Sequence, residues 1–221
     1  MTAALAPCVR RLIAVEIDRD LAAALPARVP ANVLVVVGDF LEVDLDALVR
    51  DERRPIRVAG NLPYNVASPI LFRLLDAADE GRRIRDAVVM LQKEVADRLV
   101  AAPGADGYGA LTIQVQLLAD VERVLALPPG AFRPAPKVTS ALVRLRFRGA
   151  AAEVGDRGRF ARLVRGLFQQ RRKTLLNALR PLVKAHGQSA GQVLEAAELT
   201  PSRRPETLTV AEMARLSRAV L

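Results

Sequence analysis

The sequence predicts an α/β protein with a largely parallel sheet, followed by a small all-helical domain. Up to residue 148, short runs of β-branched residues alternate with segments of helical periodicity, which is typical of βαβ units. Beyond Arg148 the strand pattern stops and only helical periodicity continues. We therefore predict two domains, residues 1–148 and 149–221.

Each element of the first domain follows from a local pattern. Ser68 and Pro69 suit the N-cap and first position of a helix. The segments 121–128 and 139–147 read as an antiparallel closing pair, joined by the proline-rich loop "PPGAFRPAPKV". In chain order we expect strand 11–17, helix 18–25, strand 33–39, strand 56–62, helix 68–78, strand 86–92, helix 93–101, a glycine-rich loop with a helix in 104–119, and the closing pair.

Two signals define helices in the second domain. Thr209 and Glu212 have the spacing of a capping box, so a final helix should begin at about Val210. The stretch 159–168 is amphipathic, with apolar residues at positions i, i+3, i+4, i+7 and i+8: Phe160, Leu163, Val164, Leu167 and Phe168.

Composition limits the classes of function. The chain carries a net charge of +9, and residues 151–221 hold 13 Lys and Arg against 6 Asp and Glu, which favours a polyanionic partner. Cys8 is the single cysteine, so we expect a reduced core residue in a cytosolic protein. With His186 as the one histidine, neither a metal cluster nor a Ser-His-Asp system is indicated. We also see no membrane span and no signal layout.

Polar side chains follow three predicted strands at intervals of about one strand-helix unit. Glu16, Asp39 and Asn61 should therefore project from one edge of the sheet, which is where such sheets bind ligands. A carboxylate there can accept both ribose hydroxyls, and another can accept from an adenine amino group. Alternatively, each residue merely solvates a strand end.

The segment Asn61-Leu62-Pro63-Tyr64 is suited to chemistry on an exocyclic amine. An amide oxygen and a free backbone carbonyl, aimed at the two N–H bonds, would hold the nitrogen in a nucleophilic shape. Pro63 stiffens the turn and helps to leave the Leu62 carbonyl unpaired. Tyr64 offers a face for stacking a flipped base. A proline turn with a packed tyrosine is the structural alternative.

These residues resemble the adenine N6-dimethyltransferases of small-subunit ribosomal RNA, which have a Rossmann-like fold and use S-adenosylmethionine. The resemblance covers nearly the whole chain, with its motifs in the family's order. It rests on "AVEIDRDL" (14–21), "GDFLEVDL" (38–45), "NLPYNVASPIL" (61–71), "MLQKEVADRL" (90–99), "YGALTIQVQ" (108–116), "FRPAPKVTSALVRL" (132–145) and "FQQRRKTLLNAL" (168–179).

The resemblance implies a role for each matching residue. Glu16 is expected to bind the cofactor ribose and Asp39 the cofactor adenine, with Asn61 also at the cofactor. Phe132 is expected to form a second wall of the target pocket, although loop packing would explain it as well. The implied reaction is stepwise methylation of two adjacent adenines near the 3′ end of the 16S RNA. The expected catalytic residues are Asn61, Leu62, Pro63 and Tyr64.

One part of the family pattern has no counterpart in this sequence. The family's first strand and glycine-rich cofactor loop would precede "TAALA" (2–6). In this fold that strand is central, between the strands that carry Glu16 and Asn61. We therefore expect the sheet to be interrupted between these two strands.

A basic stretch, "QQRRKTLLNALRPLVK" (169–184), indicates RNA binding through phosphate contacts. A solvated helix face is the alternative. We expect its cations to lie within a few helical turns, with 157–165 extending the surface. The candidate RNA-binding residues are Phe132, Arg171, Arg172, Lys173 and Arg180, with Lys184 beside them.

We therefore predict an S-adenosylmethionine-dependent rRNA adenine dimethyltransferase that acts in biogenesis of the small ribosomal subunit, without metal or membrane. Three alternatives remain. A related methyltransferase could act on large-subunit RNA and confer antibiotic resistance. A non-catalytic ribosome-assembly factor could bind RNA without the glycine-rich loop. A generic nucleotide-binding domain would leave the Pro-Tyr turn and the basic stretch unexplained.

Overall fold

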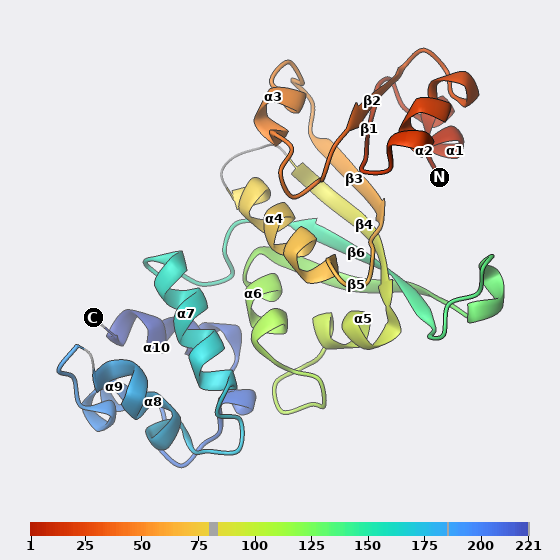
Figure 1. The fold of residues 1–221 in the computed structure, drawn as a ribbon. Coiled ribbons are helices and arrows are strands. Elements are labelled where there is room, and N and C mark those ends of the chain that lie inside the picture. The colour runs from red at the N-terminus through yellow and green to blue at the C-terminus, as the bar shows by residue number, and fades with distance from the viewer. Residues whose placement is uncertain (80–83, 185, 221) are drawn as a thin grey trace. The chain divides into compact units, whose positions relative to one another are not determined.

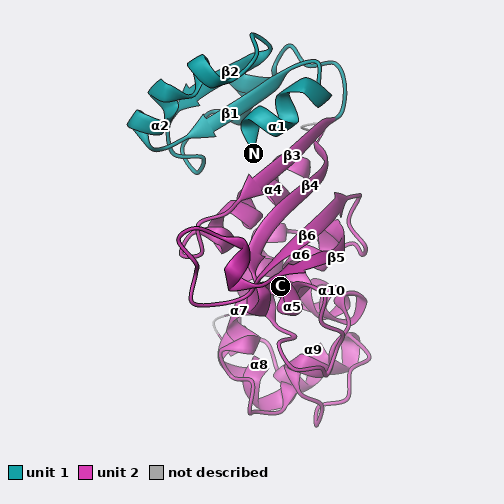
Figure 2. Ribbon diagram, turned by 90° about the vertical axis from the view of Figure 1, so that its right-hand side faces the viewer, with its two compact units in different colours: residues 1–55 teal, residues 56–221 magenta. Residues whose placement is uncertain are grey.

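The computed structural model describes residues 1–79, 84–184 and 186–220 (Figure 1). The chain divides into two compact units, residues 1–55 and 56–221 (Figure 2). The boundary predicted between residues 148 and 149 lies inside the second unit, and it stays a prediction.

The first unit is built on two parallel strands. β1 (Leu12–Glu16) pairs with β2 (Val33–Val37), with Glu16 opposite Val37. α2 (Arg19–Ala24) connects them and begins after Asp18, whose carboxylate accepts hydrogen bonds from two backbone amides. These elements confirm the first predicted strand-helix-strand unit. The remaining elements are α1 (Thr2–Leu5), η1 (Ala6–Cys8), η2 (Pro26–Arg28) and α3 (Leu45–Val49).

The expectation that Cys8 is a core residue is wrong. Cys8 is exposed at the end of η1, and its Sγ lies 3.8 Å from the carbonyl oxygen of Ala4. The reason is local geometry: in this short 3₁₀ turn Ala6 faces the interior, with no exposed surface, and Cys8 faces outward.

The second unit contains a mixed sheet in the strand order β3-β4-β6-β5. Its strands are β3 (Ile56–Asn61), β4 (Ile84–Gln92), β5 (Ala119–Leu127) and β6 (Ser140–Phe147). β3 and β4 are parallel, whereas β6 is antiparallel to both β4 and β5, which confirms the predicted closing pair. Among the described residues, β1 and β2 form a separate sheet, so the expected interruption is observed.

Three helices of the second unit lie between its strands in the chain. α4 (Ala67–Asp79) packs against β4, and α6 (Ala110–Leu118) contacts both α4 and α5 (Lys93–Leu99). The predicted N-cap at Ser68 is wrong, because α4 already begins at Ala67 and the carbonyl of Val66 accepts from Ile70. Pro69 therefore stands third in the helix, where its missing N–H would have had no intrahelical partner.

The C-terminal helices confirm both sequence signals of this region. The predicted apolar face of α7 (Arg157–Phe168) is buried except at Phe168, which is half-buried. α10 (Val210–Ala219) begins with the predicted capping box, in which Thr209 and Glu212 bond reciprocally. The other elements are η3 (Pro129–Ala131), α8 (Leu175–Lys184), α9 (Ala190–Ala196) and η4 (Pro205–Thr207).

Tyr108 connects the sheet layer to these helices. Its side chain is fully buried, and its hydroxyl donates a 2.7 Å hydrogen bond to the carbonyl of Leu208. Its ring meets that of Phe168 edge to face, with centroids 6.4 Å apart. Burial raises the pKa of Tyr108 to about 12. None of the helices in the described ranges combines the length and apolarity needed to cross a membrane.

Candidate active site

The segment 61–64 leads from β3 directly into α4. Leu62 donates its backbone N–H to the carbonyl of Met90 at 3.2 Å, which extends the β3–β4 ladder past Asn61. The chain then turns at Pro63, whose carbonyl accepts from Val66 at 3.1 Å. Two backbone hydrogen bonds thus hold both ends of the segment at the carboxyl edge of the sheet.

This anchoring leaves two acceptors unpaired. The Leu62 side chain is buried, at 8% exposure, so the residue is held by both its amide and its side chain. Among the described residues, no donor reaches the Leu62 carbonyl oxygen, and the exposed amide of Asn61 has no hydrogen-bond partner. An amide oxygen and a carbonyl oxygen on consecutive residues are therefore available to bind N–H groups.

A cavity of about 280 Å³ lies beside these acceptors. Its walls combine the segment after β3, Met90 of β4, and the loop between β5 and β6. The structure thereby brings together Phe132 and the four predicted residues of the Asn-Leu-Pro-Tyr segment. The lining residues are Asn61, Leu62, Pro63, Tyr64, Met90, Phe132, Pro134 and Pro136.

Tyr64 is held by a buried serine. Its hydroxyl lies 2.8 Å from Oγ of Ser140, the first residue of β6, which has no exposed surface. The tyrosine itself remains 37% exposed. The hydrogen bond restricts the ring while leaving part of it accessible at the cavity.

The sequence did not indicate four of these residues. Met90, Pro134 and Pro136 line the cavity, and Ser140 holds Tyr64. The prolines carried a weak signal, since they follow Phe132 at alternate positions in a loop already considered for the pocket. Met90 and Ser140 carried none, because their role depends on the pairing of β4 with β3 and β6.

Glu16 and Asp39 lie at one edge of the first unit. The carbonyl of Glu16 accepts from Gly38 at 2.9 Å, which extends the β1–β2 ladder to the residue before Asp39. One carboxylate oxygen of Glu16 accepts from the amide of Asp18, and one of Asp39 from that of Leu41. Within the described residues the second oxygen of each carboxylate makes no hydrogen bond. A carboxylate with one free oxygen therefore stands at or just after the end of each strand of the β1–β2 pair, Glu16 as the last residue of β1 and Asp39 two residues after β2.

The opposite end of the β3–β4 pair is tied by an ion pair. Arg57 donates two hydrogen bonds, of 2.8 and 2.9 Å, to the buried carboxylate of Asp86. Hydrogen bonding from Arg57 outweighs burial and lowers the pKa of Asp86. The pair stabilises the parallel register whose far end carries Asn61.

The predicted basic residues do not form one continuous helical surface. Arg171, Arg172 and Lys173 lie in the turn between α7 and α8, because α7 ends at Phe168 and the amide of Lys173 bonds back to Gln170. Arg180 is on α8. All four side chains are exposed.

Comparison with known proteins decides the family. The family model described as ribosomal RNA adenine dimethylase matches residues 1–216. The chain belongs to the ribosomal RNA adenine dimethylase family. The family and enzyme class predicted from the sequence are therefore confirmed.

Relatives in this dimethylase family align over most of the chain. It is 47% identical to a ribosomal RNA small subunit methyltransferase A of Xanthomonas oryzae pv. oryzae, over 93% of this chain and 76% of the relative. It is 43% identical to the protein of the same name from Acinetobacter baylyi, over 93% of this chain and 73% of that protein.

Solved structures confirm the fold class. The crystal structure of a dimethyladenosine transferase from Plasmodium falciparum superposes with a TM-score of 0.80, covering 97% of this chain and 83% of that one, at 24% identity. The 23S rRNA methyltransferase ErmE gives a TM-score of 0.64, covering 98% of this chain and 84% of that one, at 25% identity.

Proposed function

We propose that this protein transfers methyl groups from S-adenosylmethionine to N6 of two adjacent adenines near the 3′ end of small-subunit ribosomal RNA. The observation that carries the proposal is the cavity formed by Asn61, the unpaired Leu62 carbonyl, Tyr64 and Phe132. The small-subunit substrate is supported by the names of relatives that are 43–47% identical, compared with 25% for ErmE.

Target binding follows from the acceptors at the cavity. The two N–H bonds of the adenine amine would be accepted by Asn61 Oδ1 and the Leu62 carbonyl, which draws the nitrogen lone pair out of the ring. Stacking of the base on Tyr64, opposite Phe132, would add about 1–3 kcal/mol. Among the described residues that line the cavity there is no carboxylate, lysine or histidine, so the proton released after transfer would pass to water.

The two carboxylate acceptors of the first unit suit the hydroxyl and amino groups of the cofactor. Glu16 would hold the ribose and Asp39 the adenine through their unpaired carboxylate oxygens, and Asn61 would stand at the methyl donor as well as at the target. When bound, S-adenosylmethionine supplies an electrophilic methyl group. The contribution of the protein is to orient the amine and to keep its lone pair available.

The test measures methyl transfer to naked small ribosomal subunits with a radiolabelled methyl donor. We expect Asn61→Ala to lower the rate at least about a hundredfold, the cost of removing one preorganised electrostatic contact to a reacting group. Asn65→Ala is the matched control, since Asn65 is exposed in the same turn but does not line the cavity. An unimpaired Asn61→Ala variant would refute the role of this amide.

Two further readings separate the alternatives. Transfer to naked large subunits instead of small ones would favour the ErmE-like activity. Binding of small subunits without any transfer by the unsubstituted protein would favour a non-catalytic RNA-binding factor.

A further inference from the structure

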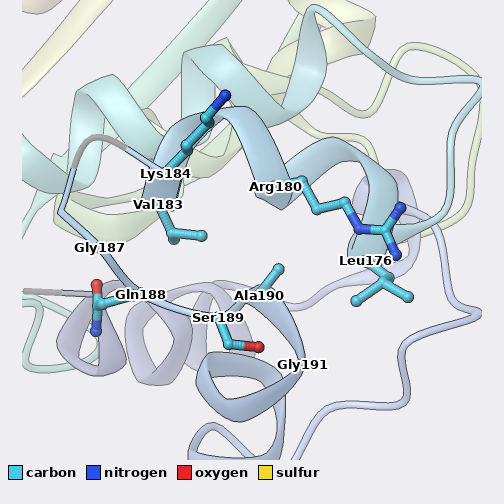
Figure 3. Close-up of a pocket in the computed structure, with 9 residues that line it drawn as sticks. All are labelled: Leu176, Arg180, Val183, Lys184, Gly187, Gln188, Ser189, Ala190 and Gly191. Carbon is cyan, nitrogen blue, oxygen red and sulfur yellow. The ribbon is translucent and has the colours of Figure 1, made fainter.

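A second hollow lies in the second unit, between α8 and α9 (Figure 3). Its volume is about 720 Å³, within the range of ligand-binding sites. Val183 of α8 and Ala190 of α9 point into the space between the two helices (Figure 3). We call this hollow the α8–α9 groove. It is lined by Leu176, Arg180, Val183, Lys184, Gly187, Gln188, Ser189, Ala190 and Gly191.

The groove has an apolar floor and a cationic rim. Leu176 supplies its partly exposed apolar side chain, and Val183 and Ala190, which are 1% and 6% exposed, close the bottom. Arg180 and Lys184 stand one helical turn apart on α8; in Figure 3 the Arg180 guanidinium lies beside Leu176, whereas the Lys184 ammonium points away from α9, outside the hollow. Both are exposed, and neither has a carboxylate partner within the described residues. None of the described lining residues is acidic.

We propose that the α8–α9 groove binds one unpaired nucleotide of the ribosomal RNA substrate, with Arg180 and Lys184 on its flanking phosphates; this proposal rests on the proposed function. The apolar floor accepts the base and ribose, and the two cations neutralise phosphates that lie outside the hollow. A concave site selects a splayed nucleotide, whereas a duplex backbone is bound on an open surface. The groove thereby adds an apolar subsite beside Arg180 and Lys184, which the sequence had already indicated as basic residues for RNA.

Three variants test the site. Arg180→Gln with Lys184→Gln removes the cationic rim. The charge-matched control is Arg98→Gln with Arg123→Gln, two surface arginines outside the groove that pair with Glu94 and Asp97. Gly191→Leu fills the groove without changing charge.

The chain can accommodate the filling variant. A Cβ at Gly191 would have Ser189 Oγ as its nearest neighbour, at 3.7 Å, which is an ordinary van der Waals contact. The residue lies inside α9, where leucine is a better helix former than glycine. Circular dichroism of Gly191→Leu and of both double variants confirms that each is folded before binding is measured.

The probes are naked small ribosomal subunits and a fluorescent single-stranded RNA dodecamer, titrated at several salt concentrations. We expect the rim variant to bind the dodecamer about tenfold more weakly and to reduce the slope of log K against log salt by about 1.4, or 0.7 for each lost phosphate contact. Gly191→Leu should weaken binding severalfold, and the control pair should lose less than the rim variant.

Equal losses in the rim variant and the control pair would overturn the proposal, because net charge alone would then explain them. Parent-like RNA binding by Gly191→Leu, or tighter binding of a poly-glutamate peptide than of RNA, would overturn it as well. These outcomes differ from failure of the proposed function, which would appear as absence of RNA binding or of methyl transfer by the unsubstituted protein.

Discussion

At the scale of single residues, a hydrogen bond to Ser140 ties Tyr64, which we propose stacks on the target base, to the core of the sheet. We expect Ser140→Ala to lower kcat/KM for small subunits about three- to tenfold, because the tyrosine ring loses a contact that restricts its orientation. Loss of stability should stay near 1 kcal/mol, since Tyr64 is 37% exposed and its hydroxyl can bond to water once the serine hydroxyl is gone. Steady-state kinetics and urea unfolding measure the two effects.

A double-mutant cycle with Tyr64→Phe separates positioning from general damage to β6. Tyr64→Phe removes the same hydrogen bond from the other side while keeping the ring. If the bond acts as proposed, Ser140→Ala has little further effect in the Tyr64→Phe protein. Equal effects of Ser140→Ala in the parent and in the Tyr64→Phe protein would contradict a role of this hydrogen bond in positioning the ring.

At the scale of elements, Gly166 of α7 leaves room for the Leu182 side chain of α8. A Cβ at this position would lie 2.6 Å from Cδ2 of Leu182 and 3.0 Å from its Cδ1. We expect Gly166→Ala to destabilise the protein by about 1–2 kcal/mol, because overpacking outweighs the gain of roughly 1 kcal/mol in helix propensity. Urea unfolding provides the measurement.

The same contact supplies a rescue experiment. Leu182→Ala removes the atoms that the new methyl group would strike. In the Leu182→Ala background, Gly166→Ala should therefore become neutral or stabilising. A Gly166→Ala protein more stable than its parent would contradict the overpacking, because the Leu182 side chain would then shift without cost.

At the scale of the whole molecule, we expect Glu212 to contribute to stability against acid. Its carboxylate accepts two hydrogen bonds from Arg203 and is also bonded to Thr209. Hydrogen bonding from Arg203 is the main cause that lowers the pKa of Glu212 to about 2 from its ordinary value of 4.5. A carboxyl whose pKa is lower in the folded state stabilises the fold above its unfolded pKa, and this stabilisation is lost as the pH falls toward 2.

We therefore expect Glu212→Gln to reduce the free energy of unfolding at neutral pH by on the order of 2 kcal/mol. The variant should also show a weaker decline in stability between pH 4.5 and 2 than the parent does. Glu195→Gln, at an exposed position on α9, is the matched control. If the stability of Glu212→Gln depended on pH as that of the parent does, this carboxylate would not be the main cause of the decline in stability between pH 4.5 and 2.

The positions of the strands and helices were determined by local sequence pattern. Alternating β-branched runs specify β1 to β4, and the Thr209–Glu212 box specifies the start of α10, because these signals act within a few residues. The order Asn-Leu-Pro-Tyr after a strand likewise determined which segment would form the candidate site. Local pattern misplaced Cys8 and Ser68, whose environments depend on how a short turn faces its surroundings.

The tertiary structure alone decided which distant residues complete each site. Strand order β3-β4-β6-β5 places Met90 and Ser140 beside the Asn-Leu-Pro-Tyr segment, although Ser140 is 76 residues from Tyr64. Packing of α8 against α9 likewise creates the groove that Arg180 and Lys184 line. The physical reason is range: hydrophobic period and capping are local properties of the chain, whereas a cavity exists only after strand pairing and helix packing bring remote segments together.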